Sequence, residues 1–133
     1  MHKLLSAYNL TAALREIYSN VAVQIIKQDL SCASAEEQQL LQLSEPQCWI
    51  REVYLQGDGA NVIHARVVVP LSTYKKFQKT FDTLGNRALG ESFLYQMPHT
   101  RTLFAYKQRD ELWQRHSIFE ISNHKILVIE YFL

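Results

Sequence analysis

Three charged side chains lie on predicted strands among mainly apolar neighbours, and together they could bind a small anion. Arg66 and Glu130 interrupt mainly apolar runs, and Arg51 lies on the more apolar face of its predicted strand. Arginine and glutamate are almost never fully buried unless they are paired, because an unpaired buried charge is costly or shifts its ionisation. We therefore expect all three to have partners, either in the protein or in a ligand.

The strands predicted around these charges give each of them apolar neighbours. In an extended chain the side chains alternate between two faces, so residues two apart share a face. Each charge is therefore expected in a buried or half-buried setting. The neighbours are Trp49, Val53 and Leu55 for Arg51, His64 and Val68 for Arg66, and Val128 and Phe132 for Glu130.

Two interpretations of this set remain open. In the first, an arginine and Glu130 form an internal ion pair, or an edge strand exposes them, and no ligand is involved. In the second, the charges form a buried anion pocket. A forked guanidinium would donate two parallel hydrogen bonds to a carboxylate, and Glu130 would accept one from a hydroxyl at the far end of the ligand. The second interpretation predicts a small hydroxy acid as the ligand.

The glycine-containing segment 84–90 could add backbone amides to such a pocket, because glycine permits close approach to an anion. However, the segment follows a helical pattern and lacks the Gly-Lys-Ser/Thr ending of a phosphate-binding loop. A helix C-cap followed by a turn explains the same residues, and the sequence favours this simpler interpretation.

Six β-rich runs must position the three charges. Two of them are expected to form a hairpin across residues 57–61, whose glycines permit the positive φ of a tight turn. The expected strands are 21–26, 49–56, 62–69, 102–107, 117–121 and 125–132.

Helices are expected at the start and in the middle of the chain. Asn9 can cap a helix that leads into the first strand, and Ser34 with Glu37 matches a capping box. Pro70 closes the third strand, and helical spacing of aromatic residues then continues to Gly85. This pattern predicts an α+β fold with a six-stranded antiparallel sheet and helices on one side.

The composition is that of one globular domain covering residues 1–133, with 47% hydrophobic and 20% charged residues. Fourteen Lys and Arg against thirteen Asp and Glu give a net charge of +1, which is too small to attract nucleic acid. No run approaches the roughly 18 apolar residues that span a bilayer. We expect a cytoplasmic, monomeric protein with no nucleic-acid partner and no membrane insertion.

The sequence gives no sign of metal or cofactor chemistry. The five histidines have no His-Glu-x-x-His spacing, and Cys32 and Cys48 form no Cys-x-x-Cys pair. Neither Gly-x-Ser-x-Gly nor Gly-x-Gly-x-x-Gly occurs. We therefore expect no metal and no cofactor.

Most of the chain resembles the bacterial chorismate lyase family. The resemblance extends over residues 49–133 and includes the passage from Leu10 to Lys27. Each motif is short, but their order and spacing match throughout. The motifs are Trp49-Ile50-Arg51-Glu52, Ala65-Arg66-Val67-Val68-Val69-Pro70-Leu71-Ser72-Thr73, Leu84-Gly85, Leu89-Gly90, Leu112-Trp113 and Ile129-Glu130-Tyr131-Phe132-Leu133.

The resemblance implies a chorismate-lyase-like fold with an enclosed pocket and the conversion of chorismate to pyruvate and 4-hydroxybenzoate, in ubiquinone biosynthesis. It also implies roles for single residues. Arg51 would bind the ring carboxylate, the Leu89 backbone amide would contribute to binding, and Glu130 would bond the ring hydroxyl. Arg66 would aid the departing enolpyruvyl carboxylate, and Arg66 and Glu130 would be the catalytic residues.

The chain also departs from the family pattern. Leu10 replaces a methionine that lines the family's pocket, which is a volume-conserving change, and the family is usually longer at both ends. Two other functions are therefore considered. One is a non-catalytic protein that binds 4-hydroxybenzoate or a related aromatic acid in the same pocket. The other is a protein-interaction module in which Arg51 and Glu130 are paired internally.

Overall fold

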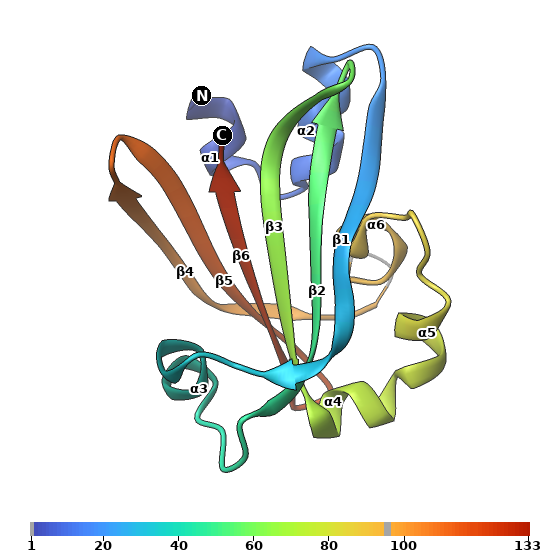
Figure 1. Cartoon of the computed structure of the whole chain (residues 1–133), viewed down its shortest axis with the longest axis vertical. Coiled ribbons are helices and arrows are strands. Elements are labelled where there is room, and N and C mark those ends of the chain that lie inside the picture. The colour runs from blue at the N-terminus through green and yellow to red at the C-terminus, as the bar shows by residue number, and fades with distance from the viewer. Residues whose placement is uncertain (1, 95–96) are drawn as a thin grey trace.

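A computed structural model describes residues 2–94 and 97–133 and confirms the predicted α+β class. Six strands form one antiparallel sheet in the order β1-β2-β3-β6-β5-β4 (Figure 1). Every predicted strand is present, and each extends beyond its expected bounds. The strands are β1 (Val21–Cys32), β2 (Gln47–Gly57), β3 (Ala60–Pro70), β4 (Thr100–Arg109), β5 (Leu112–Ile121) and β6 (His124–Phe132).

Two N-terminal helices cover one end of the sheet. Helix α1 (His2–Ser6) was not predicted, whereas α2 (Leu10–Ile17) begins as expected after Asn9, whose Oδ1 accepts a hydrogen bond of 3.0 Å from the Ala12 amide. Both helices bury leucines against the strands. Leu5 and Leu14 pack with apolar residues that include Phe132, close to the C-terminus, and Figure 1 shows α1 beside that end of the chain.

Helix α3 (Ala35–Leu41) packs on the opposite face of the sheet. It begins with the predicted capping box, in which Glu37 N donates to Ser34 Oγ at 3.1 Å and Ser34 N donates to Glu37 Oε1 at 2.8 Å. Leu41 lies in a buried cluster with Ile50 and Val68. One helix therefore lies on the face that the prediction left without helices.

Three short helices, α4 (Leu71–Lys76), α5 (Gln78–Asp82) and α6 (Leu89–Ser92), follow β3. The sequence predicted one helix up to Leu84, but Phe77, at φ −115° and ψ 25°, divides α4 from α5. Phe81 and Leu84 are fully buried in a cluster with Trp49. None of the helices in the described ranges is long and apolar enough to cross a membrane.

Candidate functional site

A largely apolar cavity lies on the face of the sheet that α2 and α6 cover. Its walls come from both helices and from all six strands. The charged side chains among the described lining residues are Arg51, Arg101, Arg115 and Glu130. The other lining residues are Asn9, Leu10, Thr11, Val23, Val53, Leu55, Ala65, Val67, Ala88, Leu89, Gly90, Leu94, Phe119 and Val128.

Arg51 projects from β2 into this cavity and is only 2% exposed. Its NH1 group donates to Gln28 Oε1 at 2.8 Å, and its NH2 group donates to two backbone oxygens, Gly85 O and Arg87 O, each at 2.8 Å. The glycine segment 84–90 therefore contributes carbonyl groups that hold the guanidinium in place. Gly85 adopts φ +59°, a conformation that favours glycine.

The three acceptors that Arg51 contacts are all neutral, and no carboxylate in the described part of the chain lies within ion-pair distance of it. Burial lowers the pKa of Arg51 to about 10, because the protein interior disfavours the charged form. A buried cation surrounded by neutral groups stabilises a bound anion, since an anion supplies the missing opposite charge. Arg51 also has five N–H groups, so it can donate to a ligand while keeping these contacts.

Glu130 lies in the same cavity, on β6, and forms a buried ion pair. Arg115 Nε donates to Glu130 Oε1 at 2.7 Å, and Arg115 NH2 donates to Oε2 at 3.2 Å. The two residues are direct neighbours across β5 and β6, and they are 2% and 8% exposed. Of the two interpretations from the sequence, internal pairing therefore holds for Glu130, although its partner is Arg115, whereas Arg51 fits the anion pocket.

Arg115 also joins the Glu130 carboxylate to the end of α1 and the link to α2. Its NH1 group donates to the backbone oxygens of Leu4 at 3.4 Å, Leu5 at 3.1 Å and Ala7. These carbonyls belong to the end of α1 and the link to α2, where a helix leaves its last carbonyl groups without intrahelical partners. The Arg115 guanidinium therefore holds both the Glu130 carboxylate and the end of α1 in place.

Arg66 does not share the cavity, which corrects its expected position beside the departing group. In the β2–β3 hairpin, Gln56 pairs with Asn61, but the register then shifts by one residue, so Leu55 pairs with Ile63. Arg51 consequently lies opposite Val67, and Arg66 lies opposite Glu52 on the other face. A shift of one residue exchanges the two faces of a strand.

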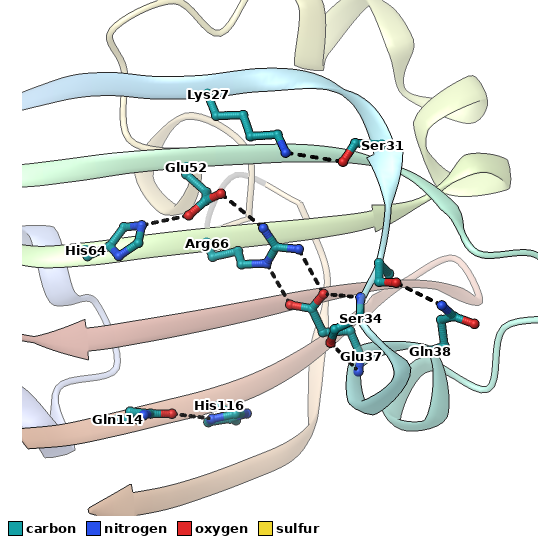
Figure 2. A network of polar contacts seen from close by, with 11 residues as sticks. Lys27, Ser31, Ser34, Glu37, Gln38, Glu52, His64, Arg66, Gln114 and His116 are labelled. Atoms are coloured by element: carbon teal, nitrogen blue, oxygen red, sulfur yellow. Dashed lines mark hydrogen bonds and ion pairs between the residues drawn. The ribbon is translucent and has the colours of Figure 1, made fainter. Parts of the chain in front are cut away.

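On that other face, Arg66 belongs to a network of ion pairs, which Figure 2 shows. Its Nε and NH2 groups donate to the two carboxylate oxygens of Glu37 at 2.7 and 2.9 Å, and its NH1 group donates to Glu52 at 3.0 Å. Burial acts to raise the pKa of Glu37, but the hydrogen bonds from Arg66 and from the Ser34 backbone outweigh it and lower the pKa. The network joins α3 to β2 and β3.

Leu10 and Leu89, both predicted as binding residues, line the cavity from α2 and α6. The sequence prediction missed Arg101 and Arg115, which line it from β4 and β5. Both lie just before the predicted start of their strand, at residues 102 and 117, so the predicted alternation of faces does not extend to them. Counting back from Phe119 in steps of two would have placed Arg115 on the cavity face.

The sheet register sets the distance between the cation and the carboxylate. Arg51 is aligned through Val67 with Val128, which is two residues before Glu130 on β6. Two strand spacings and two residues along the strand separate the Cα atoms of Arg51 and Glu130 by about 12 Å on a flat sheet. Because both side chains line the cavity, one ring with a polar group at each end can lie between them.

Comparisons with known proteins identify relatives of this chain. A family model described as Chorismate lyase matches residues 2–133. A chorismate pyruvate-lyase of Cronobacter sakazakii is 35% identical over 89 residues, which are 67% of this chain and 53% of that protein. A probable chorismate pyruvate-lyase of Photobacterium profundum is 31% identical over 139 residues, with 99% of this chain and 76% of that protein covered. The chain therefore spans about half to three quarters of these relatives.

Solved structures share the fold at low sequence identity. The PhnF C-terminal domain has a TM-score of 0.67 and 11% identity, and the match covers 83% of this chain and 80% of that chain. The effector domain of PhnF from Mycobacterium smegmatis has a TM-score of 0.64 and 12% identity, and the match covers 96% and 88% of the two chains. At this identity the likeness shows the fold alone.

Proposed function

The chain belongs to the chorismate lyase family, as its sequence motifs predicted, and we propose that it eliminates pyruvate from chorismate to leave 4-hydroxybenzoate for ubiquinone biosynthesis. The observation that carries the proposal is the buried guanidinium of Arg51, which has neutral protein partners and faces an apolar cavity. A ring carboxylate supplies the negative charge that this setting favours.

The elimination needs little chemistry from the protein. The bond between a ring carbon and the enolpyruvyl oxygen breaks, the neighbouring carbon that carries the hydroxyl loses its proton, and the ring becomes aromatic. The electron pair of the broken bond leaves with the oxygen, and the released enolate takes up one proton on carbon to become pyruvate. Because the ring is poised to aromatise, the enzyme mainly holds the reactive conformer, stabilises charge on the leaving group and excludes water.

Arg51 and Glu130 would hold the two ends of the ring. Arg51 donates hydrogen bonds to the ring carboxylate, and Glu130 accepts one from the hydroxyl while Arg115 keeps its carboxylate in place. The backbone amide of Leu89, in the first turn of α6, adds a donor on the Arg51 side, and Leu10 closes the apolar wall. Arg66 is left out of this arrangement because its guanidinium pairs with Glu37 and Glu52 on the other face.

The test is to incubate the protein with chorismate and to measure pyruvate and 4-hydroxybenzoate over time. We expect both products in equal amounts, at a rate above the spontaneous reaction, and a loss of at least tenfold in kcat/KM for Arg51→Gln. Tight binding of 4-hydroxybenzoate without pyruvate release would replace the lyase with an aromatic-acid binding protein. If the protein shows no turnover and 4-hydroxybenzoate does not stabilise it against heat, an interaction module is favoured. A ligand at a concentration of 100 times its Kd adds about 2.7 kcal/mol to the free energy of unfolding, so binding would be visible as a thermal shift.

A further inference from the structure

We propose that a groove on the other face of the sheet is a second ligand site, which binds a neutral molecule with several hydroxyl groups, a sugar or a polyol. The groove lies between α3 and the strands β4, β5 and β6, and its volume is about 540 Å³. Small-molecule sites in proteins have volumes of about 300–1,000 Å³. The inference goes beyond the proposed function, because no described residue lines both this groove and the cavity of Arg51.

The alternation of side chains along β5 and β6 builds the groove behind the cavity. Arg115 and Glu130 line the cavity, so the residues that follow them in the chain, His116 and Tyr131, point to the opposite face. There α3 covers only part of the sheet, and the groove remains beside it. Ile129 and residues of α3 complete the lining, which combines apolar and polar groups.

His116 is the residue that points to a ligand. It is only 6% exposed, and its Nε2 lies 3.3 Å from Gln114 Oε1, a pair that Figure 2 shows apart from the Arg66 network. An amide oxygen can only accept, so Nε2 carries the proton and Nδ1 is left as an acceptor. Nδ1 has no hydrogen-bond partner in the described part of the chain. Buried polar groups normally have a partner, and a hydroxyl in the groove would supply it.

The His116 ring is neutral at neutral pH, which keeps Nδ1 available as an acceptor. Burial lowers the pKa of His116, and the nearby ammonium group of Lys107 adds to this effect. The carboxylates of Glu36 and Glu37 act in the opposite direction and are outweighed.

Tyr131 and Gln114 place hydrogen-bond donors next to this acceptor. The two residues are direct neighbours across β6 and β5, and both line the groove. The Tyr131 ring stacks on His64, with 5.3 Å between the ring centres, so its position is fixed. Among the described residues its hydroxyl has no hydrogen-bond partner. A hydroxyl group of a ligand both donates and accepts, so a molecule with several hydroxyls matches this mixed set of donors and acceptors.

The charges along the groove favour a neutral ligand. The described lining residues carry two carboxylates, Glu36 and Glu37, and two cations, Lys107 and Arg109. Lys107 Nζ donates to Glu36 Oε1 at 2.7 Å, and Glu37 is held by Arg66. A charged ligand would compete with these ion pairs, whereas a neutral one leaves them intact. No group of residues in the described ranges could hold a metal ion.

The test measures binding of glucose, galactose, N-acetylglucosamine, myo-inositol and glycerol to the full chain by saturation-transfer NMR and calorimetry. We expect saturable binding of at least one of them, unchanged by saturating 4-hydroxybenzoate, which occupies the other face. Tyr131→Phe removes one oxygen, and His116→Gln removes the ring acceptor. Each should raise the Kd about 3- to 10-fold, as expected for the loss of one neutral hydrogen bond. Tyr54→Phe, on the same face but outside the described lining, is the matched control and should not change the Kd.

Four results would overturn the proposal. The first is that none of the five molecules binds saturably. The second is binding that stays unchanged in both Tyr131→Phe and His116→Gln, since the molecule would then lie elsewhere. The third is displacement by 4-hydroxybenzoate, which would place the molecule in the cavity. The fourth is binding of phosphate or glycine that is lost in the two variants while the sugars and polyols do not bind. Chorismate turnover enters none of these measurements, so the proposed function stands or fails separately.

Discussion

Replacing Arg115 with methionine tests how much the buried ion pair between Arg115 and Glu130 contributes to the stability of the protein. The change removes both hydrogen bonds to Glu130, at 2.7 and 3.2 Å, and the donors to the Leu4, Leu5 and Ala7 carbonyls. Methionine fills most of the volume, so the main effect is electrostatic. The Glu130 carboxylate, in a residue that is 8% exposed, is left without its counter-ion.

The expected loss of stability follows from this burial. Breaking a buried ion pair by removing one partner destabilises a protein by about 3–5 kcal/mol, because the remaining charge stays buried. With an unfolding entropy of about 2.1 cal/mol/K per residue, a chain of 133 residues loses about 1 °C in Tm for each 0.28 kcal/mol. Arg115→Met should therefore lower Tm by about 11–18 °C in a thermal denaturation experiment.

A double variant separates the charge effect from lost packing. Arg115→Met combined with Glu130→Gln leaves no unpaired charge at this position. The double variant should therefore lose less unfolding free energy than the sum of the losses in the two single variants, by at least about 1 kcal/mol. Urea denaturation of the four proteins measures this coupling. Additive effects, or a Tm within about 2 °C of the unaltered protein for Arg115→Met, would show that the ion pair does not hold this region.

Three further predictions concern the pocket, the opposite face and the core. Arg51→Gln should weaken 4-hydroxybenzoate binding about 10- to 100-fold in calorimetry, because a charge-assisted bond is lost, and an unchanged Kd would exclude Arg51 from the site. The pKa of Glu37 is lower in the folded protein than its ordinary value of 4.5, so its stabilisation is complete above that value and is lost as the pH falls through the folded pKa. Glu37→Gln should accordingly show a weaker loss of unfolding free energy between about pH 5 and pH 3, and an equally steep loss would contradict the ion pair with Arg66. Leu14→Ala should cost about 2–5 kcal/mol in urea denaturation, since Leu14 is fully buried, whereas Leu10→Met should cost less than about 1.5 kcal/mol because it conserves volume.

Local signals in the sequence predicted most of the elements, because their causes are local. The capping residues Asn9 and Ser34 mark the starts of α2 and α3, and Pro70 ends β3 where the missing N–H interrupts the ladder. The ends of the strands were less predictable. A strand continues as long as its neighbour pairs with it, and this depends on the partner strand more than on residue type.

The same limit explains which site residues were found. Arg51 lies on the more apolar face of its strand and Glu130 stands inside a long apolar run, so their own strands indicate that they are buried. Arg115 stands among polar neighbours, Gln114 and His116, and its burial comes from pairing with Glu130 on the next strand and from the cover by α1. Alternation along β5 can place Arg115 on the cavity face, but its burial there depends on the neighbouring strand and helix and is a tertiary property.

Arg66 shows how one residue of register can decide a functional assignment. If the pairing of Gln56 with Asn61 continued without a shift, Arg51 would stand directly opposite Arg66, and two guanidinium groups would face the cavity side by side. The shift next to Leu55 turns Arg66 to the other face, where Glu37 and Glu52 receive it. Like charges directly opposite each other destabilise a sheet, and the acceptors on α3 and β2 stabilise the observed register. The charge of Arg66 is therefore used to attach α3 to the sheet.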